Sequence, residues 1–222
     1  MMKLGRLYLK KGTPNDDAEG FNWLNRAYNA PNRNLEAGAY VGDCYLSGRG
    51  TKQDAQKAEE IIMPLANQNV VPAKTLAGRI LVYKAEIKRT EAAGSANPKI
   101  QKQLVAQANE LDRQARQWWE RAEKDDWNAA AHLGKFYEEG WGGVEKSEEQ
   151  AEKRYKGGVN HGNALSMLFY GLMIEKKPAR RSEAETLISR AATAGLPSAI
   201  KWCKDNNVTF GEKRPNDDRQ KE

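Results

Sequence analysis

The sequence predicts an all-α fold, a right-handed α-solenoid of about five helix-turn-helix units. Three observations support this prediction. Apolar residues recur at steps of three and four, glycine-rich turns interrupt them, and one pattern returns at a fixed period. We expect the third unit to extend into an antiparallel helical arm and a C-terminal capping helix to follow the fifth. Such a chain stacks small units side by side, because a single hairpin cannot bury its own apolar face.

Composition indicates a chain that folds and does not enter a membrane. The 222 residues include 36 Lys or Arg and 30 Asp or Glu, a formal net charge of +6, and 18 aromatic residues (6 Trp, 8 Tyr and 4 Phe). No run approaches the roughly 18 consecutive apolar residues of a membrane helix, and the first residues lack the apolar run of a secretory signal. We therefore expect a cytoplasmic protein, or a periplasmic or secreted one if an N-terminal signal has been removed.

The repeat is clearest in two segments. One starts at residue 37 and reads AGAYVGDCYLSGRG, and the other starts at residue 129 and reads AAAHLGKFYEEGWGG. The small residues at equivalent positions are Ala37, Ala73, Ala129, Ala164 and Ala199, separated by 36, 56, 35 and 35 residues. The period is thus about 36, with one insertion of about 20. The predicted units are 1–36, 37–72, 73–128, 129–163 and 164–198, with a capping helix at 199–206, in one domain (1–210) followed by a disordered tail (211–222).

Each unit has the pattern of a helical hairpin. In the first helix, Val41 and Tyr45 are spaced as on one helical face, and the glycine-rich connection that follows cannot continue a helix. The second helix carries its own stripe, such as Ile62 and Leu65, and its end is marked by turn residues such as Gly195.

A glycine recurs inside the first helix, where it costs about 1 kcal/mol relative to alanine. This recurrence predicts that the two helices of a unit approach too closely for a side chain at that position. The glycines are Gly5, Gly42, Gly78 and Gly134. The fifth unit has Phe169 at the aligned position, which predicts looser or shifted packing there.

These motifs resemble the Sel-one-like repeat (SLR), a subfamily of the tetratricopeptide-type solenoids. The resemblance rests on GDCYLSGRG (42–50) and GKFYEEGWG (134–142), on Lys57-Ala58, and on RAATAGLPSA (190–199). It covers nearly the whole chain, from Leu4 to about Trp202, as five SLR units plus part of a sixth helix. It implies a protein that binds other proteins.

The insertion in the third unit predicts the arm. Asn97 is placed to cap a new helix and Pro98 suits its first turn. An apolar stripe on the second arm helix is expected to pack on Val82, Ala85 and Ile87 of the first. That stripe is Ile100, Leu104, Ala108, Leu111, Ala115 and Trp118. A partner-binding arm and a tolerated insertion both remain open.

The residues give little support for catalysis. Cys44 and Cys203 are expected to be buried free thiols, far apart along the solenoid. His132 has no carboxylate or serine at a telling spacing, so we expect it to be packed or on the surface, and His161 to lie in a loop. We therefore predict no enzymatic activity, no cofactor and no metal site.

The predicted site is the concave face. By resemblance, the residue after each glycine position points into this face, giving Arg6, Asp43, Arg79, Lys135 and Tyr170. Three of these five residues are basic, which favours an acidic peptide or protein as partner. Inward neighbours one turn away include Glu138, together with Thr75, Val82, Ser166 and Met173. Trp141, in a glycine-rich turn, is a further candidate anchor.

The leading functional hypothesis is a non-enzymatic protein–protein interaction scaffold or adaptor that binds through its concave face. One alternative is an inhibitor or immunity protein for a bacterial toxin enzyme. A second alternative, a nucleic-acid-binding module, is motivated by the isoelectric point of about 9.2 but disfavoured by the mixed signs of the charges. The sequence specifies no oligomeric state.

Overall fold

The computed structural model describes residues 1–211, which form eleven α-helices, one short 3₁₀ helix and no strand. The all-α prediction is confirmed. The α-helices are α1 (Met2–Lys11), α2 (Pro14–Tyr28), α3 (Leu35–Ser47), α4 (Ala55–Asn67), α5 (Val71–Ala93), α6 (Pro98–Glu120), α7 (Trp127–Glu139), α8 (Glu148–Asn160), α9 (Ala164–Glu175), α10 (Arg181–Thr193) and α11 (Pro197–Asp205). The 3₁₀ helix η1 (Pro178–Arg180) precedes α10.

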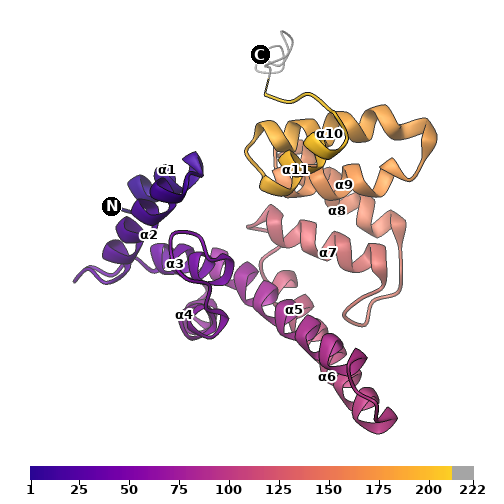
Figure 1. The fold of residues 1–222 in the computed structure, drawn as a ribbon, viewed down its shortest axis with the longest axis horizontal. Coiled ribbons are helices and arrows are strands. Elements are labelled where there is room, and N and C mark those ends of the chain that lie inside the picture. Colours follow the sequence, from indigo (N-terminus) through magenta and orange to yellow (C-terminus); the bar gives the residue numbers. More distant parts are fainter. Residues whose placement is uncertain (212–222) are drawn as a thin grey trace.

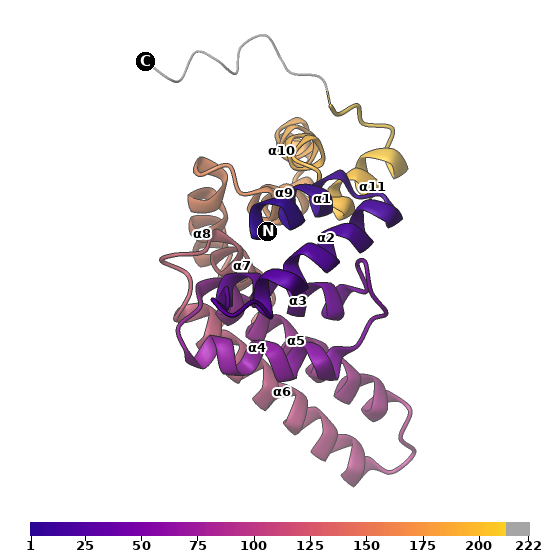
Figure 2. The same cartoon turned by 90° about the vertical axis from the view of Figure 1, so that its left-hand side faces the viewer.

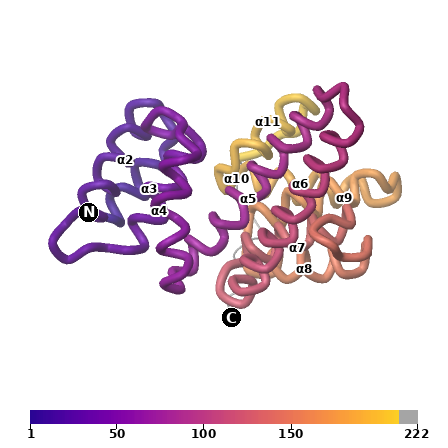
Figure 3. Tube along the Cα trace, turned by 90° about the horizontal axis from the view of Figure 1, so that it is seen from below, coloured from indigo at the N-terminus to yellow at the C-terminus, as the bar shows by residue number. Residues whose placement is uncertain are grey.

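The helices pair in chain order and the pairs stack into a curved solenoid. Five hairpins form, α1 with α2, α3 with α4, α5 with α6, α7 with α8 and α9 with α10, and α11 packs on α10. Figure 1 shows α1–α4 on one side and α7–α11 on the other, joined by the long α5–α6 pair. Figure 3, seen from below, shows the same two groups of helices with α5 between them. The predicted solenoid is confirmed.

Local sequence signals set where the helices begin and end. The side chains of Asn34, Asp54 and Ser147 accept hydrogen bonds from backbone N–H groups in the first turns of α3, α4 and α8. Gly48 and Gly140, with φ of 75° and 76°, end α3 and α7 in the left-handed conformation that glycine adopts without strain. The glycine-rich turns predicted from the repeat are therefore helix C-caps.

The glycines inside the first helices are notches for the second helices. A methyl carbon placed on Gly42 would lie 2.5 Å from the side chain of Ile62, and one on Gly134 would lie 2.6 Å from the ring of Tyr155. Both distances are too short for real atoms, so only glycine allows this approach. The close packing predicted from glycine recurrence is thus present.

The prediction for the fifth unit was wrong by two residues. Gly171, and not Phe169, takes the notch position, because a methyl carbon there would lie 2.5 Å from Ile188 of α10. The small residue five positions before the notch is correspondingly the buried Ser166 rather than Ala164. The packing of this unit is as close as in the others.

The third unit forms the predicted arm. Its helices, α5 and α6, have 23 residues each, and the Asn97 side chain caps α6 as expected. Figure 2 shows both helices reaching beyond the rest of the stack. The predicted register was wrong near the base of the arm, where Trp119 is buried and Trp118 only half-buried. Ile100, near the tip, is 46% exposed.

A buried ion pair lies inside the arm. Asp112 is 1% exposed and accepts a hydrogen bond from the Arg89 guanidinium on the facing helix. Its second oxygen, Oδ1, has no partner among the described residues. Removal from water raises the pKa of the Asp112 carboxyl, and the Arg89 guanidinium opposes that rise. The buried face of α6 therefore includes a charged residue between alanines.

The C-terminal helix begins two residues earlier than the capping helix predicted at 199–206, at Pro197. The tail predicted to be disordered, 211–222, lies outside the described residues from position 212 onward. Within residues 1–211, no helix combines the length and the apolar character needed to cross a membrane. The division into repeat units remains our interpretation of the helical pairs.

A concave groove as the candidate functional site

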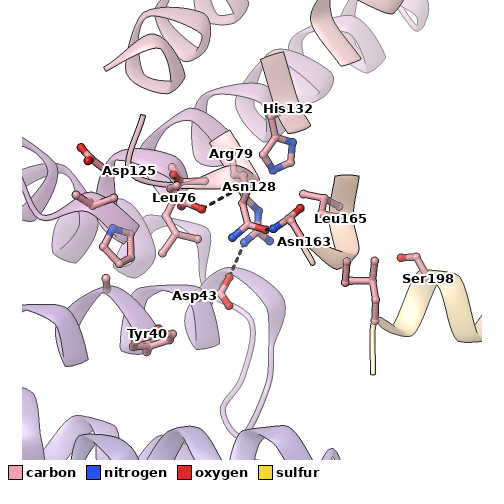
Figure 4. Close-up of a pocket in the computed structure, with 17 residues that line it drawn as sticks. Tyr40, Asp43, Leu76, Arg79, Asp125, Asn128, His132, Asn163, Leu165 and Ser198 are labelled. Atoms are coloured by element: carbon pink, nitrogen blue, oxygen red, sulfur yellow. Dashed lines mark hydrogen bonds and ion pairs between the residues drawn. The ribbon is translucent and has the colours of Figure 1, made fainter. Parts of the chain in front are cut away.

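A groove of about 720 Å³ runs along the inner side of the stack. It is lined by α3 and α5 and by the N-terminal parts of α7, α9 and α11, so that first helices and the capping helix share one surface (Figure 4). The lining residues are Ala39, Tyr40, Asp43, Val71, Pro72, Thr75, Leu76, Arg79, Asp125, Asp126, Asn128, His132, Asn163, Ala164, Leu165, Leu196 and Ser198. The groove combines apolar side chains with carboxylate and amide oxygens.

Two predicted site residues meet in this groove as an ion pair. The guanidinium of Arg79 on α5 donates to Oδ1 of Asp43 on α3 at 2.7 Å. Figure 4 shows the two side chains pointing toward one another between the helices. Because Asp43 offsets the charge of Arg79, this part of the column presents little net positive charge to a partner.

His132 lies on the groove wall and packs on the core. Its ring stacks on Trp119 with the centroids 4.6 Å apart, and the indole N–H of Trp119 donates to the backbone oxygen of Thr75. Removal from water, with a smaller contribution from Arg79, lowers the pKa of His132 to about 3. The imidazole is therefore neutral near pH 7 and serves as a flat, uncharged wall.

Polar side chains at the starts of α7 and α9 form a second part of the wall. Asp126 caps α7 and also accepts a hydrogen bond from the Thr75 hydroxyl at 2.7 Å. Asn163 caps α9 through its oxygen, and its amide nitrogen donates to Oδ1 of Asn128 at 3.0 Å. These bonds tie neighbouring units together along the groove and fix the orientation of its polar atoms.

Two other predicted basic residues lie outside the groove lining. Arg6 is exposed, with its guanidinium 5.0 Å from the ring centre of Tyr40 and 4.0 Å from Glu36. Lys135 donates to Glu139 at 2.7 Å and lies 3.3 Å from Glu138. The three basic residues of the predicted inward column, Arg6, Arg79 and Lys135, therefore each contact aromatic or acidic side chains nearby.

Two predicted inward residues are buried instead. Tyr170 is 2% exposed, and its hydroxyl donates to Glu152 and accepts from Arg180. Glu138 is also buried and accepts hydrogen bonds from Tyr155 and Lys176. Both residues stabilise the packing between units and do not face a partner in the groove. The placement of Tyr170 in the inward column followed from the wrong notch register in the fifth unit.

Trp141 is exposed as anticipated, at 43%, in the turn after α7. Its ring meets Phe136 edge-on with the centroids 6.0 Å apart, and it does not line the groove. Sequence reasoning missed the roles of Tyr40, His132 and Asn163 as groove residues. Tyr40 and Asn163 each lie near a unit's small residue, and comparison of these positions across units could have found them.

No cluster of three or more His, Cys, Asp or Glu side chains suited to a metal ion occurs within residues 1–211. Cys44 and Cys203 are both free and buried, as predicted. Burial raises the pKa of the Cys44 thiol to about 12, so this sulfur is protonated and unreactive near neutral pH.

Comparison with known proteins identifies the repeat. The family model described as Sel1 repeat matches residues 1–32, 36–60, 109–125 and 127–153. These four segments are similar to Sel1 repeats. Sel1 repeats generally mediate contacts between proteins, and their helical scaffold is typically non-catalytic.

One solved structure supports this fold, and a second is reported beside it. A Sel1 repeat protein from Oxalobacter formigenes is 23% identical, with 93% of this chain and 77% of that chain covered and a TM-score of 0.51. A protective antigen with an SLR fold, present in uropathogenic Escherichia coli strains, is 19% identical, with 96% of this chain and 42% of that chain covered and a TM-score of 0.47. No curated protein sequence matches the chain.

Proposed function

We propose that this chain is a non-enzymatic interaction module that holds a segment of a partner protein in the concave groove. The observation that carries the proposal is the groove itself, which is continuous across α3, α5, α7, α9 and α11. A surface built from several units suits an extended polypeptide, because successive residues of the partner can meet successive helices.

The groove chemistry favours a partner with apolar and basic side chains. Three Asp and one Arg line it, and the single Arg is already paired with Asp43. Leu165 and Leu196 supply half-buried apolar surface beside exposed Asp125 and Asn128. The acidic partner expected from the basic column is therefore less well matched than a basic or neutral one, and phosphate-rich nucleic acid is poorly matched for the same reason.

Site-specific photocrosslinking in extracts of the source cells tests this function. A photoreactive phenylalanine derivative replaces Tyr40, which lines the groove, or Tyr83, which is exposed on α5 outside it. We expect a covalent adduct with a partner protein from position 40 and none from position 83. Adducts formed equally from both positions, or from position 83 alone, would exclude the groove as the binding surface.

A second test fills the groove. Ser198→Trp places a large ring at the exposed groove position on α11, whereas Ser182→Trp places the same ring at an exposed position on α10 that does not line the groove. We expect the first variant to lose the photoadduct at position 40 and the second to keep it. Equal adduct yields from the two variants would contradict the proposal.

A further inference from the structure

The first helix, α1, leaves apolar side chains uncovered on one face. Leu4 is 39% exposed and Leu7 is 60% exposed, and Met1, three residues before Leu4, is 58% exposed. These residues are spaced by three along the helix and therefore share a side. α2 packs on α1, and Figure 1 shows α1 at the edge of the α1–α4 group.

The equivalent positions are buried in every later unit. The residues just before the notch glycine are Val41, Ala77, Leu133 and Tyr170, each 2% exposed or less. The residues two positions after it are Cys44, Ile80, Phe136 and Met173, each 4% exposed or less. Leu4 and Leu7 hold these same positions relative to Gly5. A single exposed leucine on a protein surface needs no explanation. Leu4 and Leu7 need one, because both occupy positions that are buried in every later unit.

In the later units, the cover is the second helix of the preceding unit. Phe136 on α7 packs edge-on against Trp119 of α6, with the ring centroids 5.0 Å apart. Tyr170 on α9 packs against Tyr155 of α8, with the centroids 6.3 Å apart. The uncovered face of α1 is therefore shaped as the receiving surface for an α-helix.

Charge indicates what kind of helix fits. A lysine lies six residues after the notch glycine in two later units. Lys84 follows Gly78 and donates a hydrogen bond to Glu59 of the preceding α4 at 2.9 Å. Lys177 follows Gly171 and pairs with Glu148 of the preceding α8. Lys11 occupies the same position on α1. Lys3, Arg6 and Lys10 add to Lys11, and α1 itself contains no acidic residue, although Lys11 also pairs with Asp16 at the start of α2 at 3.3 Å and Arg6 lies 4.0 Å from Glu36. A matching helix therefore carries acidic residues beside its apolar stripe.

This chain does not itself offer such a helix to a second copy. Each second helix is already covered by the next helix along the chain, α2 by α3, α4 by α5, α6 by α7, α8 by α9 and α10 by α11. Two copies of α1 facing each other would bring Lys3, Lys10 and Lys11 of each copy close to like charges of the other beside the apolar stripe, and this repulsion disfavours the pairing. Residues 212–222 read EKRPNDDRQKE and contain no Leu, Ile, Val, Met or aromatic residue that could fill the stripe.

We propose that the face of α1 formed by Met1, Leu4, Leu7 and Lys11 is a docking site for an amphipathic helix of a partner protein. That helix carries an aliphatic or aromatic stripe flanked by acidic residues, as α4 and α8 do toward their neighbours. The site is separate from the concave groove, so the protein holds two contact surfaces that can be disabled independently.

A defined peptide tests the docking site. The probe is a fluorescent, helix-stabilised peptide with the sequence of residues 54–69, which contains Glu59, titrated with the full chain and followed by anisotropy. We expect saturable binding that Leu7→Glu weakens at least about tenfold. Ile100→Glu, at a similarly exposed apolar position on the arm, leaves it unchanged. Lys11→Glu weakens binding, and a peptide carrying Glu59→Lys restores it.

Three outcomes would overturn the proposal. The first is a titration that never saturates. The second is an equal loss of binding in the Leu7→Glu and Ile100→Glu variants, which would indicate non-specific association. The third is a concentration-dependent dimer in sedimentation equilibrium that Leu7→Glu abolishes, which would make a second copy of this chain the occupant. Each result is independent of whether the concave groove binds a partner.

Discussion

Gly78 lies so close to the indole of Trp119 that an added methyl group would overlap the ring. The ring cannot turn aside freely, because its N–H is bonded to the Thr75 backbone and its face stacks on His132. We expect Gly78→Ala to lower the free energy of unfolding by about 2 kcal/mol, because overpacking outweighs the helical preference for alanine.

Gly94 provides the matched control, measured by the same urea denaturation. It is exposed, has a φ of −81°, and an added methyl group would lie no closer than 3.7 Å to another atom. Gly94→Ala should be neutral or stabilising by about 0.5 kcal/mol. Equal effects of the two substitutions would mean that the notch is not tightly packed.

The lowered pKa of His132 predicts a dependence of stability on pH. The folded protein resists protonation of this imidazole down to about pH 3, whereas an unfolded chain protonates it near pH 6.5. Between these values the unfolded state binds more protons, so His132 reduces stability as the pH falls, by up to about 1.4 kcal/mol per pH unit. We expect His132→Gln to remove this contribution. Parallel stability profiles for the two proteins from pH 7 to pH 4 would contradict it.

The arm is an element whose stability depends on one buried charge pair. Arg89→Met leaves the Asp112 carboxylate buried without its partner, which should cost about 3–5 kcal/mol. Adding Asp112→Leu removes the isolated charge and should recover most of that loss. A double-mutant cycle by denaturation measures this coupling, and additive effects would show that the pair does not interact.

Elements also show where sequence reasoning loses precision. α9 reads ALSMLFYGLMIE and is apolar on all sides, so its sequence has no polar face that shows which side points outward. The notch position was therefore assigned to Phe169, although Gly171 holds it. In α6, Asp112 interrupts the buried stripe, and a pattern that excluded charged residues selected Trp118 in place of Trp119. Helix existence and order were predictable, whereas rotation about the helix axis depended on contacts with neighbours.

At the scale of the whole molecule, each hairpin packs mainly on the hairpins next to it in the chain. We expect a variant that starts at Asn34, and so lacks α1 and α2, to keep the remaining helices, because solenoid units fold through nearest-neighbour contacts. Its far-UV circular dichroism should retain the helical signal per residue, and its urea m-value should fall in proportion to the lost surface. A random-coil spectrum would show that the first unit is required for all the others.

The groove could be predicted only in outline. The repeat placed Asp43 and Arg79 on the inner surface, and they lie there. Their mutual pairing could not be read from one chain, because it depends on how far successive hairpins rotate. The contributions from α11 and from the loop before α7 depend on the curvature of the whole stack, which no single repeat encodes.

The two buried thiols allow local opening to be measured at two separate places in the solenoid. Cys44 belongs to α3 in the second hairpin, Cys203 belongs to α11 at the far end, and both are buried and free. A shielded, protonated sulfur is alkylated only while its surroundings come apart. Mass spectrometry of the alkylated peptides would therefore measure the rate of local opening around each cysteine separately, in the native protein and without an added label.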